Sequence, residues 1–139
     1  MHLQLENLHK SYLDGEGRTL HILRGVELRL EQPGQTAAIV GASGTGKSTL
    51  LHLIGLLDQP DQGRVLLDDK DLSLLSRDAQ ARYRNTQLGF IFQFHQLLQD
   101  FSALENVMMP ALVQGQSHSQ SSKRASEPVS YTHLRAHET

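Results

Sequence analysis

The sequence contains no cysteine and no tryptophan, and it has no strong excess of charge of one sign. Without cysteine there is no disulfide framework, which agrees with a reducing compartment such as the cytoplasm. The net charge of −2 argues against binding to nucleic acid, because proteins that neutralise phosphates carry a basic surface. No apolar run reaches the roughly 20 residues of a membrane-spanning helix. Residues 1–6 also lack the basic and then apolar pattern of an export signal. We therefore expect any membrane association to come through a partner.

The most informative segment is a glycine-rich run that lies between two apolar runs, residues 36–40 and 50–54. It consists of Gly41, Ala42, Ser43, Gly44, Thr45, Gly46, Lys47, Ser48 and Thr49. Its glycines let the backbone curl until successive N–H groups point at phosphate oxygens. The following helix directs the positive end of its dipole at the same place. A plain Gly/Ser-rich turn would explain neither the spacing nor the flanks, so the segment predicts a nucleoside triphosphate site.

Three side chains of this loop have distinct predicted roles. Lys47 supplies a mobile positive charge for the outer phosphates. Ser48 is expected to place its hydroxyl on the magnesium ion that bridges the last two phosphates. Thr49 lies in the first turn of the helix, where backbone amides are still free.

Hydrophobic spacing predicts a mixed arrangement of strands and helices. We expect an antiparallel pair of strands at 3–8 and 19–30, a turn at 14–17, a short buried strand at 36–40, a helix at 47–57 and a strand at 64–67. Further along, we expect a polar helix-compatible segment at 76–87, a buried strand at 88–92 and a linker or surface loop at 115–124. Between the last two, Ser102 and Glu105 have capping-box spacing, so a helix should begin at Ala103 and be kinked or ended by Pro110.

Together, the phosphate loop at 41–49 and the segments 89–93 and 103–107 resemble the ATP-binding subunit of ABC transporters in order and spacing. Residues 93–98 and 100–107 are most similar to the lipoprotein-releasing, LolD-type branch of this family. Export ATPases of the MacB type and cell-division ATPases of the FtsE type carry similar stretches and stay open as alternatives. The resemblance implies an α/β fold: a P-loop NTPase core, C-terminally truncated, with an N-terminal antiparallel β-region.

The resemblance also implies residue roles and partners. Tyr12 would stack on the adenine of ATP, Lys47 would be catalytic, and Gln93 would touch Mg²⁺ together with Ser48 and sense the membrane partner. The alternatives are that Tyr12 is simply packed and that Gln93 only ends a strand. The implied partners are membrane subunits of the LolC and LolE type and a second copy of the ATPase. The implied location is peripheral, on the cytoplasmic side of the inner membrane.

Several parts that this family needs for hydrolysis have no match in the sequence: a strand ending in Asp-Glu, a Leu-Ser-Gly-Gly-Gln signature and a switch histidine. We therefore expect residues 1–127 to form a partial ATP-binding domain that is inactive alone and exposes apolar surface. Residues 129–139 resemble the translation of a sequencing adapter, so we expect 128–139 to be a non-native tail. A soluble P-loop kinase or GTPase is a weaker alternative, because no guanine-reading Asn-Lys-x-Asp motif is present.

Overall fold

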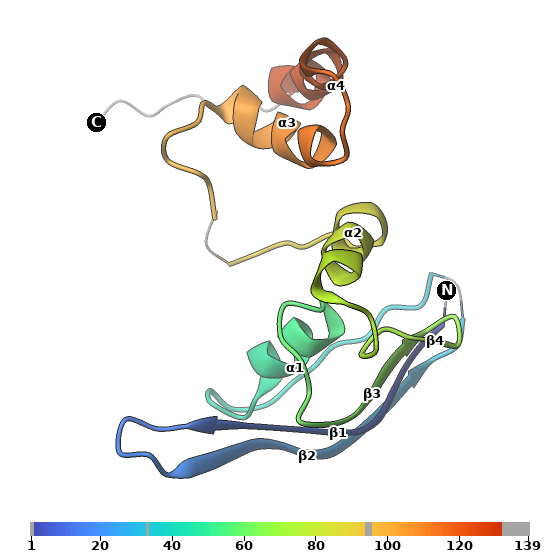
Figure 1. Ribbon diagram of the computed structural model, residues 1–139, viewed down its shortest axis with the longest axis vertical. Helices are drawn as coiled ribbons and strands as arrows, with labels where there is room; N and C mark the ends of the chain where they lie inside the picture. The colour runs from blue at the N-terminus through green and yellow to red at the C-terminus, as the bar shows by residue number, and fades with distance from the viewer. Residues whose placement is uncertain (1, 33, 94–95, 132–139) are drawn as a thin grey trace. The chain divides into compact units, whose positions relative to one another are not determined.

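The computed structural model describes residues 2–32, 34–93 and 96–131 (Figure 1). The chain divides into two compact units, Met1–Arg84 and Asn85–Thr139. The described part of the predicted tail, up to Tyr131, belongs to a helix, whereas residues 132–139 lie outside the description.

The first unit is built on a four-stranded antiparallel sheet with the order β2-β1-β3-β4. The strands are β1 (Leu3–Leu13), β2 (Thr19–Leu30), β3 (Gln62–Leu67) and β4 (Lys70–Asp71). Leu5 of β1 lies opposite Leu28 on one side and Val65 on the other. The predicted antiparallel pair and the third strand are thus confirmed.

The turn between β1 and β2 is held by one carboxylate. Asp14 accepts hydrogen bonds from the backbone N–H groups of Glu16 and Arg18, at 2.9 and 2.8 Å. Such an aspartate is a common way to close a turn, since its oxygens replace backbone acceptors. The predicted turn at 14–17 is confirmed.

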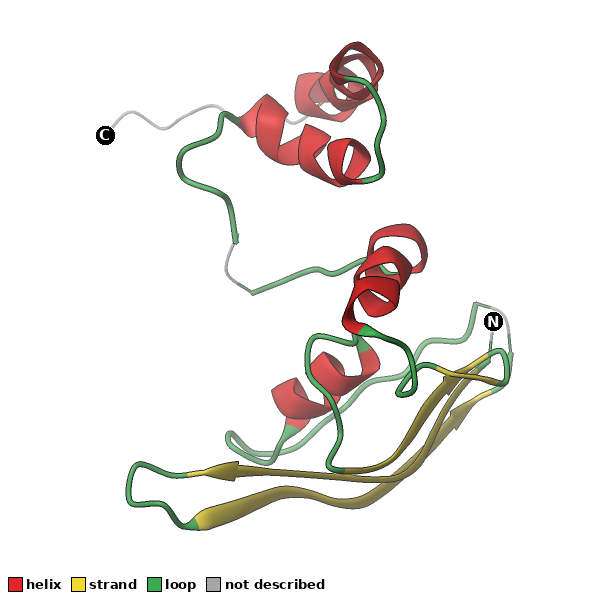
Figure 2. Cartoon of the chain, in the orientation of Figure 1, coloured by secondary structure: helices red, strands yellow, loops and turns green. Residues whose placement is uncertain are grey.

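Helix α1 (Lys47–Ile54) packs on one face of this sheet (Figure 2). Leu50 and Leu53 of the helix are buried with apolar residues of the strands. Those partners are Leu5, Leu8, Leu23 and Val65. The helix is shorter than the predicted 47–57, because Gly55 caps it and Leu56 adopts a left-handed conformation with φ of 57°. Packing on the sheet fixes the helix that follows the glycine-rich loop.

Two predicted strands are wrong. Residues 36–40 and 88–92 are loops in Figure 2, and Val40 and Ile91 are 86% and 103% exposed. An apolar run becomes a strand only when a neighbouring strand takes up its backbone hydrogen bonds. Among the described residues the sheet contains only β1 to β4, so neither segment has such a neighbour.

Helix α2 (Arg77–Gln87) agrees with the predicted polar segment at 76–87. Gln80 is its buried residue, and its side-chain amide donates to the carbonyl of Leu72 at 3.3 Å. Arg84 donates to the carbonyl of Leu56 at 2.7 Å, just beyond α1. These bonds connect α2 to the first unit through polar groups, as expected for a helix with few apolar residues.

The second unit contains two helices that contact each other, α3 (Ala103–Val113) and α4 (His118–Tyr131). The predicted capping box at Ser102 and Glu105 is confirmed, with the Ser102 side chain accepting from the Glu105 N–H. Pro110 does not end α3, which continues to Val113.

The predicted loop at 115–124 is wrong, because most of it belongs to α4. Ser117 accepts from the Gln120 N–H, and the Gln120 side chain accepts from the Ser117 N–H, both at 3.3 Å. This reciprocal pair caps the helix in the manner of a capping box. Ser121 and Ala125 are buried, as is Met108 of α3, so one face of this polar helix is covered.

Candidate functional site

The glycine-rich loop turns sharply into α1. Gly44 and Gly46 have φ values of 80° and 92°, a left-handed conformation that favours glycine. A Cβ atom on Gly46 would lie 2.9 Å from Cγ2 of Ile22 and 3.0 Å from Cδ2 of Leu23. Both the conformation and the close approach of β2 therefore require glycine at position 46.

The amino end of α1 is open for an anion. Its N-cap, Gly46, has no side chain to accept a hydrogen bond from the first turn. The N–H groups of Lys47, Ser48 and Thr49 have no intrahelical acceptors, since these lie one turn earlier along a helix. The helix dipole adds positive potential at this end, so an anion placed here gains both hydrogen bonds and favourable charge.

The Lys47 side chain forms hydrogen bonds to the backbone of its own glycine-rich loop. Its ammonium group donates to the backbone carbonyls of Gly41, at 2.9 Å, and Ala42. The Thr45 hydroxyl also donates to the Ala42 carbonyl, at 2.9 Å. These bonds hold the curled shape and keep the ammonium at the loop. A phosphate with three charged oxygens is a stronger acceptor than a carbonyl, so the ammonium can exchange partners.

The loop and Tyr12 line one pocket of about 470 Å³. Its lining residues are Tyr12, Ile22, Ser43, Gly44, Gly46, Lys47, Ser48 and Thr49. This volume falls within the range of small-molecule sites, which is about 300 to 1,000 Å³. The structure thus brings Tyr12 together with the predicted phosphate site, although Tyr12 lies 34 positions before Gly46 in the sequence.

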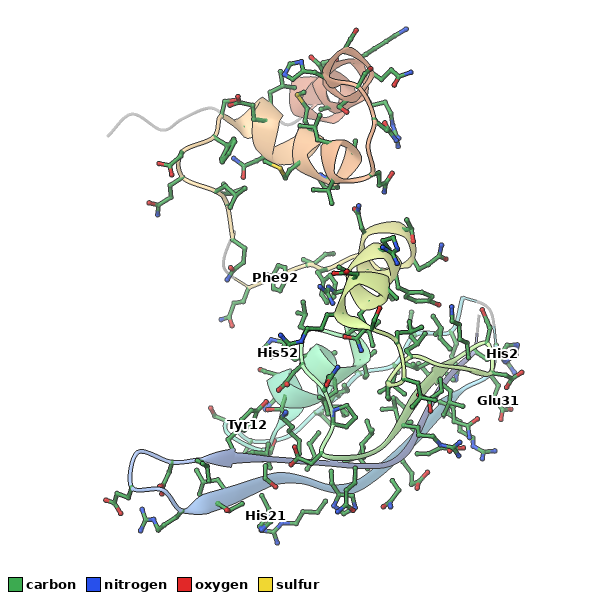
Figure 3. All side chains as sticks on the ribbon, in the orientation of Figure 1. His2, Tyr12, His21, Glu31, His52 and Phe92 are labelled. Carbon is green, nitrogen blue, oxygen red and sulfur yellow. The ribbon has the colours of Figure 1, made fainter. Side chains whose placement is uncertain are left out.

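Tyr12 lies near the end of β1 and is 40% exposed (Figure 3). Its hydroxyl donates to Oδ2 of Asp58 at 2.8 Å. Burial raises the pKa of this phenol above its usual value, and the hydrogen bond to Asp58 adds to the shift. The ring is therefore anchored at its polar end while part of its surface faces the pocket.

Gln93 belongs to the second unit, where it is exposed in a loop. That Gln93 and Ser48 bind the same magnesium ion stays a prediction. Ser43 and Ser48 are exposed, and Thr49 is half-buried.

Sequence reasoning missed Lys10 and Asp58, which both contact Tyr12. Lys10 is only 8% exposed and pairs with Asp58 at 2.9 Å. The signal was available: Leu8, Lys10 and Tyr12 alternate along one strand, and a lysine on the buried side of a strand needs an acidic partner.

A family comparison identifies the class of protein that carries this site. The model of the ABC transporter family matches residues 23–139. The chain belongs to the ABC transporter family. The predicted family resemblance is confirmed. Among the described residues, no helix combines the length and the apolar character needed to cross a membrane.

Individual relatives of this ABC transporter chain point to one branch. It is 53% identical over 118 residues to the lipoprotein-releasing system ATP-binding protein LolD of Shewanella frigidimarina, which covers 85% of this chain and 48% of that protein. It is 48% identical over 126 residues to LolD of Nitratidesulfovibrio vulgaris, covering 91% and 53% respectively. The chain spans about half the length of these curated relatives.

A solved structure supports the same fold. The dimeric post-hydrolysis state of the ATP-binding cassette MJ0796, bound to ADP and Pi, matches with a TM-score of 0.80 and 36% sequence identity. The match covers 90% of this chain and 54% of that one. The chain therefore has the fold of a partial ABC ATPase.

Proposed function

We propose that this chain is the ATP-binding part of a LolD-type ATPase that powers the release of lipoproteins from the inner membrane. The observation that carries the proposal is the single pocket formed by the phosphate loop, the open end of α1 and the Tyr12 ring. The LolD relatives, which are 53% and 48% identical to this chain, support its assignment to the LolD-type branch of the family.

In the proposed binding mode, the triphosphate lies on the loop amides and the amino end of α1. Lys47 leaves the carbonyls of Gly41 and Ala42 and binds the outer phosphates, where it stabilises negative charge. The Tyr12 ring stacks on adenine, which an aromatic face can do without hydrogen bonds. Ser48 and Gln93 hold Mg²⁺, and the bound ion neutralises phosphate charge.

Hydrolysis belongs to the complete subunit in this proposal. The Asp-Glu strand, the signature and the switch histidine have no match in these 139 residues, so the general base lies elsewhere. The MJ0796 cassettes are dimers, which supports a second copy as the partner that completes the site. Membrane subunits of the LolC and LolE type would hold the pair on the cytoplasmic side of the inner membrane.

The test is ATP turnover by the complete subunit assembled with its membrane partners. We expect Lys47→Ala to lower turnover by about 100-fold or more, because one preorganised donor to the reacting group contributes about that much. Lys70→Ala, at an exposed lysine on β4, is the matched control and should leave turnover unchanged. Normal turnover by Lys47→Ala would contradict the assignment.

A second experiment tests whether the chain belongs to the LolD-type branch of the family. Proteoliposomes that contain the complete assembly should release an acylated lipoprotein when ATP is added. ATP turnover without release would instead favour the MacB-type or FtsE-type alternative.

A further inference from the structure

Asp58 joins the turn after α1 to β1 through both of its carboxylate oxygens. Oδ1 accepts from the Lys10 ammonium at 2.9 Å, and Oδ2 accepts from the Tyr12 hydroxyl at 2.8 Å. Lys10 also donates to the carbonyl of Gln59 at 2.7 Å. The carboxylate is therefore shared between a buried cation and the phenol that lines the pocket.

The same cation also lies against the aromatic ring. The Lys10 ammonium is 5.1 Å from the centroid of the Tyr12 ring, within the range of a cation–π contact. A tyrosine ring that is held at its hydroxyl and contacted by a cation loses most of its freedom to rotate. Its stacking partner then meets a ring that is already oriented, which lowers the entropic cost of binding.

The charges of this cluster reinforce one another. Burial alone would raise the pKa of Asp58, but hydrogen bonds from Lys10, Tyr12 and the Gln59 N–H outweigh it and hold the pKa below its usual value. Asp58 thus stays ionised at neutral pH, as an acceptor for both donors. Asp61 lies close by in the sequence: its Oδ2 accepts from the Ser11 N–H at 2.7 Å, and its Oδ1 lies 3.9 Å from the Lys10 ammonium.

We propose that Asp58 is a positioning residue that holds the Tyr12 ring in place for the nucleobase, with Lys10 as its counter-ion. Asp58 follows the helix that begins at the phosphate loop, and Tyr12 lies at the end of β1. Their hydrogen bond therefore links the base site to the helix whose other end binds phosphate. This inference rests on the proposed function and concerns only how the nucleobase of ATP is bound.

The experiment compares two ligands by isothermal titration calorimetry of the 139-residue chain in the presence of Mg²⁺. ATP has a base and a triphosphate, whereas inorganic tripolyphosphate has only the phosphates. We expect Asp58→Asn to weaken ATP binding about three- to tenfold, which is part of what base stacking on an aromatic ring contributes. Tripolyphosphate binding should change less than about twofold, because the phosphate loop is untouched.

Two further variants make the test specific. Tyr12→Phe keeps the ring but removes the hydroxyl, so it should weaken ATP binding to a similar degree, and adding Asp58→Asn to it should weaken ATP binding no further. Asp78→Asn removes an exposed carboxylate on α2, outside this cluster, and should leave both affinities unchanged.

Each outcome has one meaning. Equal losses for ATP and tripolyphosphate, or unchanged ATP binding in Asp58→Asn and Tyr12→Phe, would overturn the positioning role. If the unsubstituted chain is folded by circular dichroism and binds neither ligand, the proposed function itself fails.

Discussion

Position 46 requires glycine for two reasons, its backbone conformation and its packing against β2. Its φ of 92° is strained for any residue with a side chain, and an added Cβ would contact Ile22 and Leu23 of β2. We expect Gly46→Ala to destabilise the first unit by about 1 to 3 kcal/mol. It should also weaken ATP binding, since the loop would have to shift. Chemical denaturation and calorimetry measure the two effects.

Gly15 provides the matched control for this substitution. Nothing lies within 4 Å of a Cβ placed there, and its φ is not positive. Gly15→Ala should therefore change stability by less than about 1 kcal/mol. Equal effects of the two substitutions would show that the loop tolerates a side chain at position 46.

Asp58 makes a pH-dependent contribution to stability. Its pKa in the folded chain lies below the usual value, so its contribution is present above the unfolded-state pKa and is lost as the pH falls through the folded-state pKa. We expect the denaturation midpoints of the unsubstituted chain and Asp58→Asn to differ at pH 6, and this difference to shrink as the pH falls below about 4, the usual pKa of an aspartate. A difference between the two denaturation midpoints that does not change with pH would contradict the pairing of Asp58 with Lys10 and Tyr12.

At the scale of elements, the helix α4 depends on its cap because its sequence is polar. Ser117 and Gln120 exchange hydrogen bonds at its start, and few apolar side chains compensate for their loss. We expect Ser117→Ala to cost about 1 kcal/mol and to speed amide hydrogen exchange in α4. Ser119→Ala, at an exposed position two residues after Ser117, is the control and should leave exchange unchanged. Similar exchange in both variants would show that tertiary packing alone holds the helix.

Elements with local signals could be predicted from the sequence. The alternation of Leu3, Leu5 and Leu8, the turn at Asp14 and the Ser102 capping box each determine structure from nearby residues. The curled shape of the glycine-rich loop also has a local cause, because Lys47 bonds to the carbonyl of Gly41, whereas Tyr12 and Ile22 reach the pocket from the strands.

Elements that depend on distant partners could not be predicted in this way. Residues 36–40 and 88–92 have the composition of buried strands, but composition does not supply a neighbouring strand. The sequence of helix α4 lacks the apolar spacing that indicates a helix, so its polar composition predicts a loop despite its Ser-x-x-Gln cap. The Asp58 to Tyr12 bond spans 46 positions, so only the fold brings this pair together.

At the scale of the whole molecule, exposed apolar side chains are the dominant physical feature of the described residues. Val40, Ile91 and Leu74 are 86%, 103% and 83% exposed. Apolar surface of this kind favours self-association. We expect the chain to bind a hydrophobic dye and to associate as its concentration rises, which dye fluorescence and analytical ultracentrifugation can follow.

A charge in place of one of these exposed apolar side chains should reduce the association. Ile91→Glu is expected to lower the average mass in solution, whereas Gln87→Glu adds the same charge at an exposed polar position and serves as control. A soluble monomer with a sharp, cooperative thermal transition would contradict the expectation that this chain is marginally stable by itself.

The central claim is that the loop at 41–49, with Lys47, holds the triphosphate of ATP. Calorimetric titration of the chain with ATP and Mg²⁺ tests it most directly, with Lys47→Ala as the comparison. The account predicts one saturable site per chain that is lost in Lys47→Ala. Absence of binding by a folded chain, or equal binding by both proteins, would contradict it.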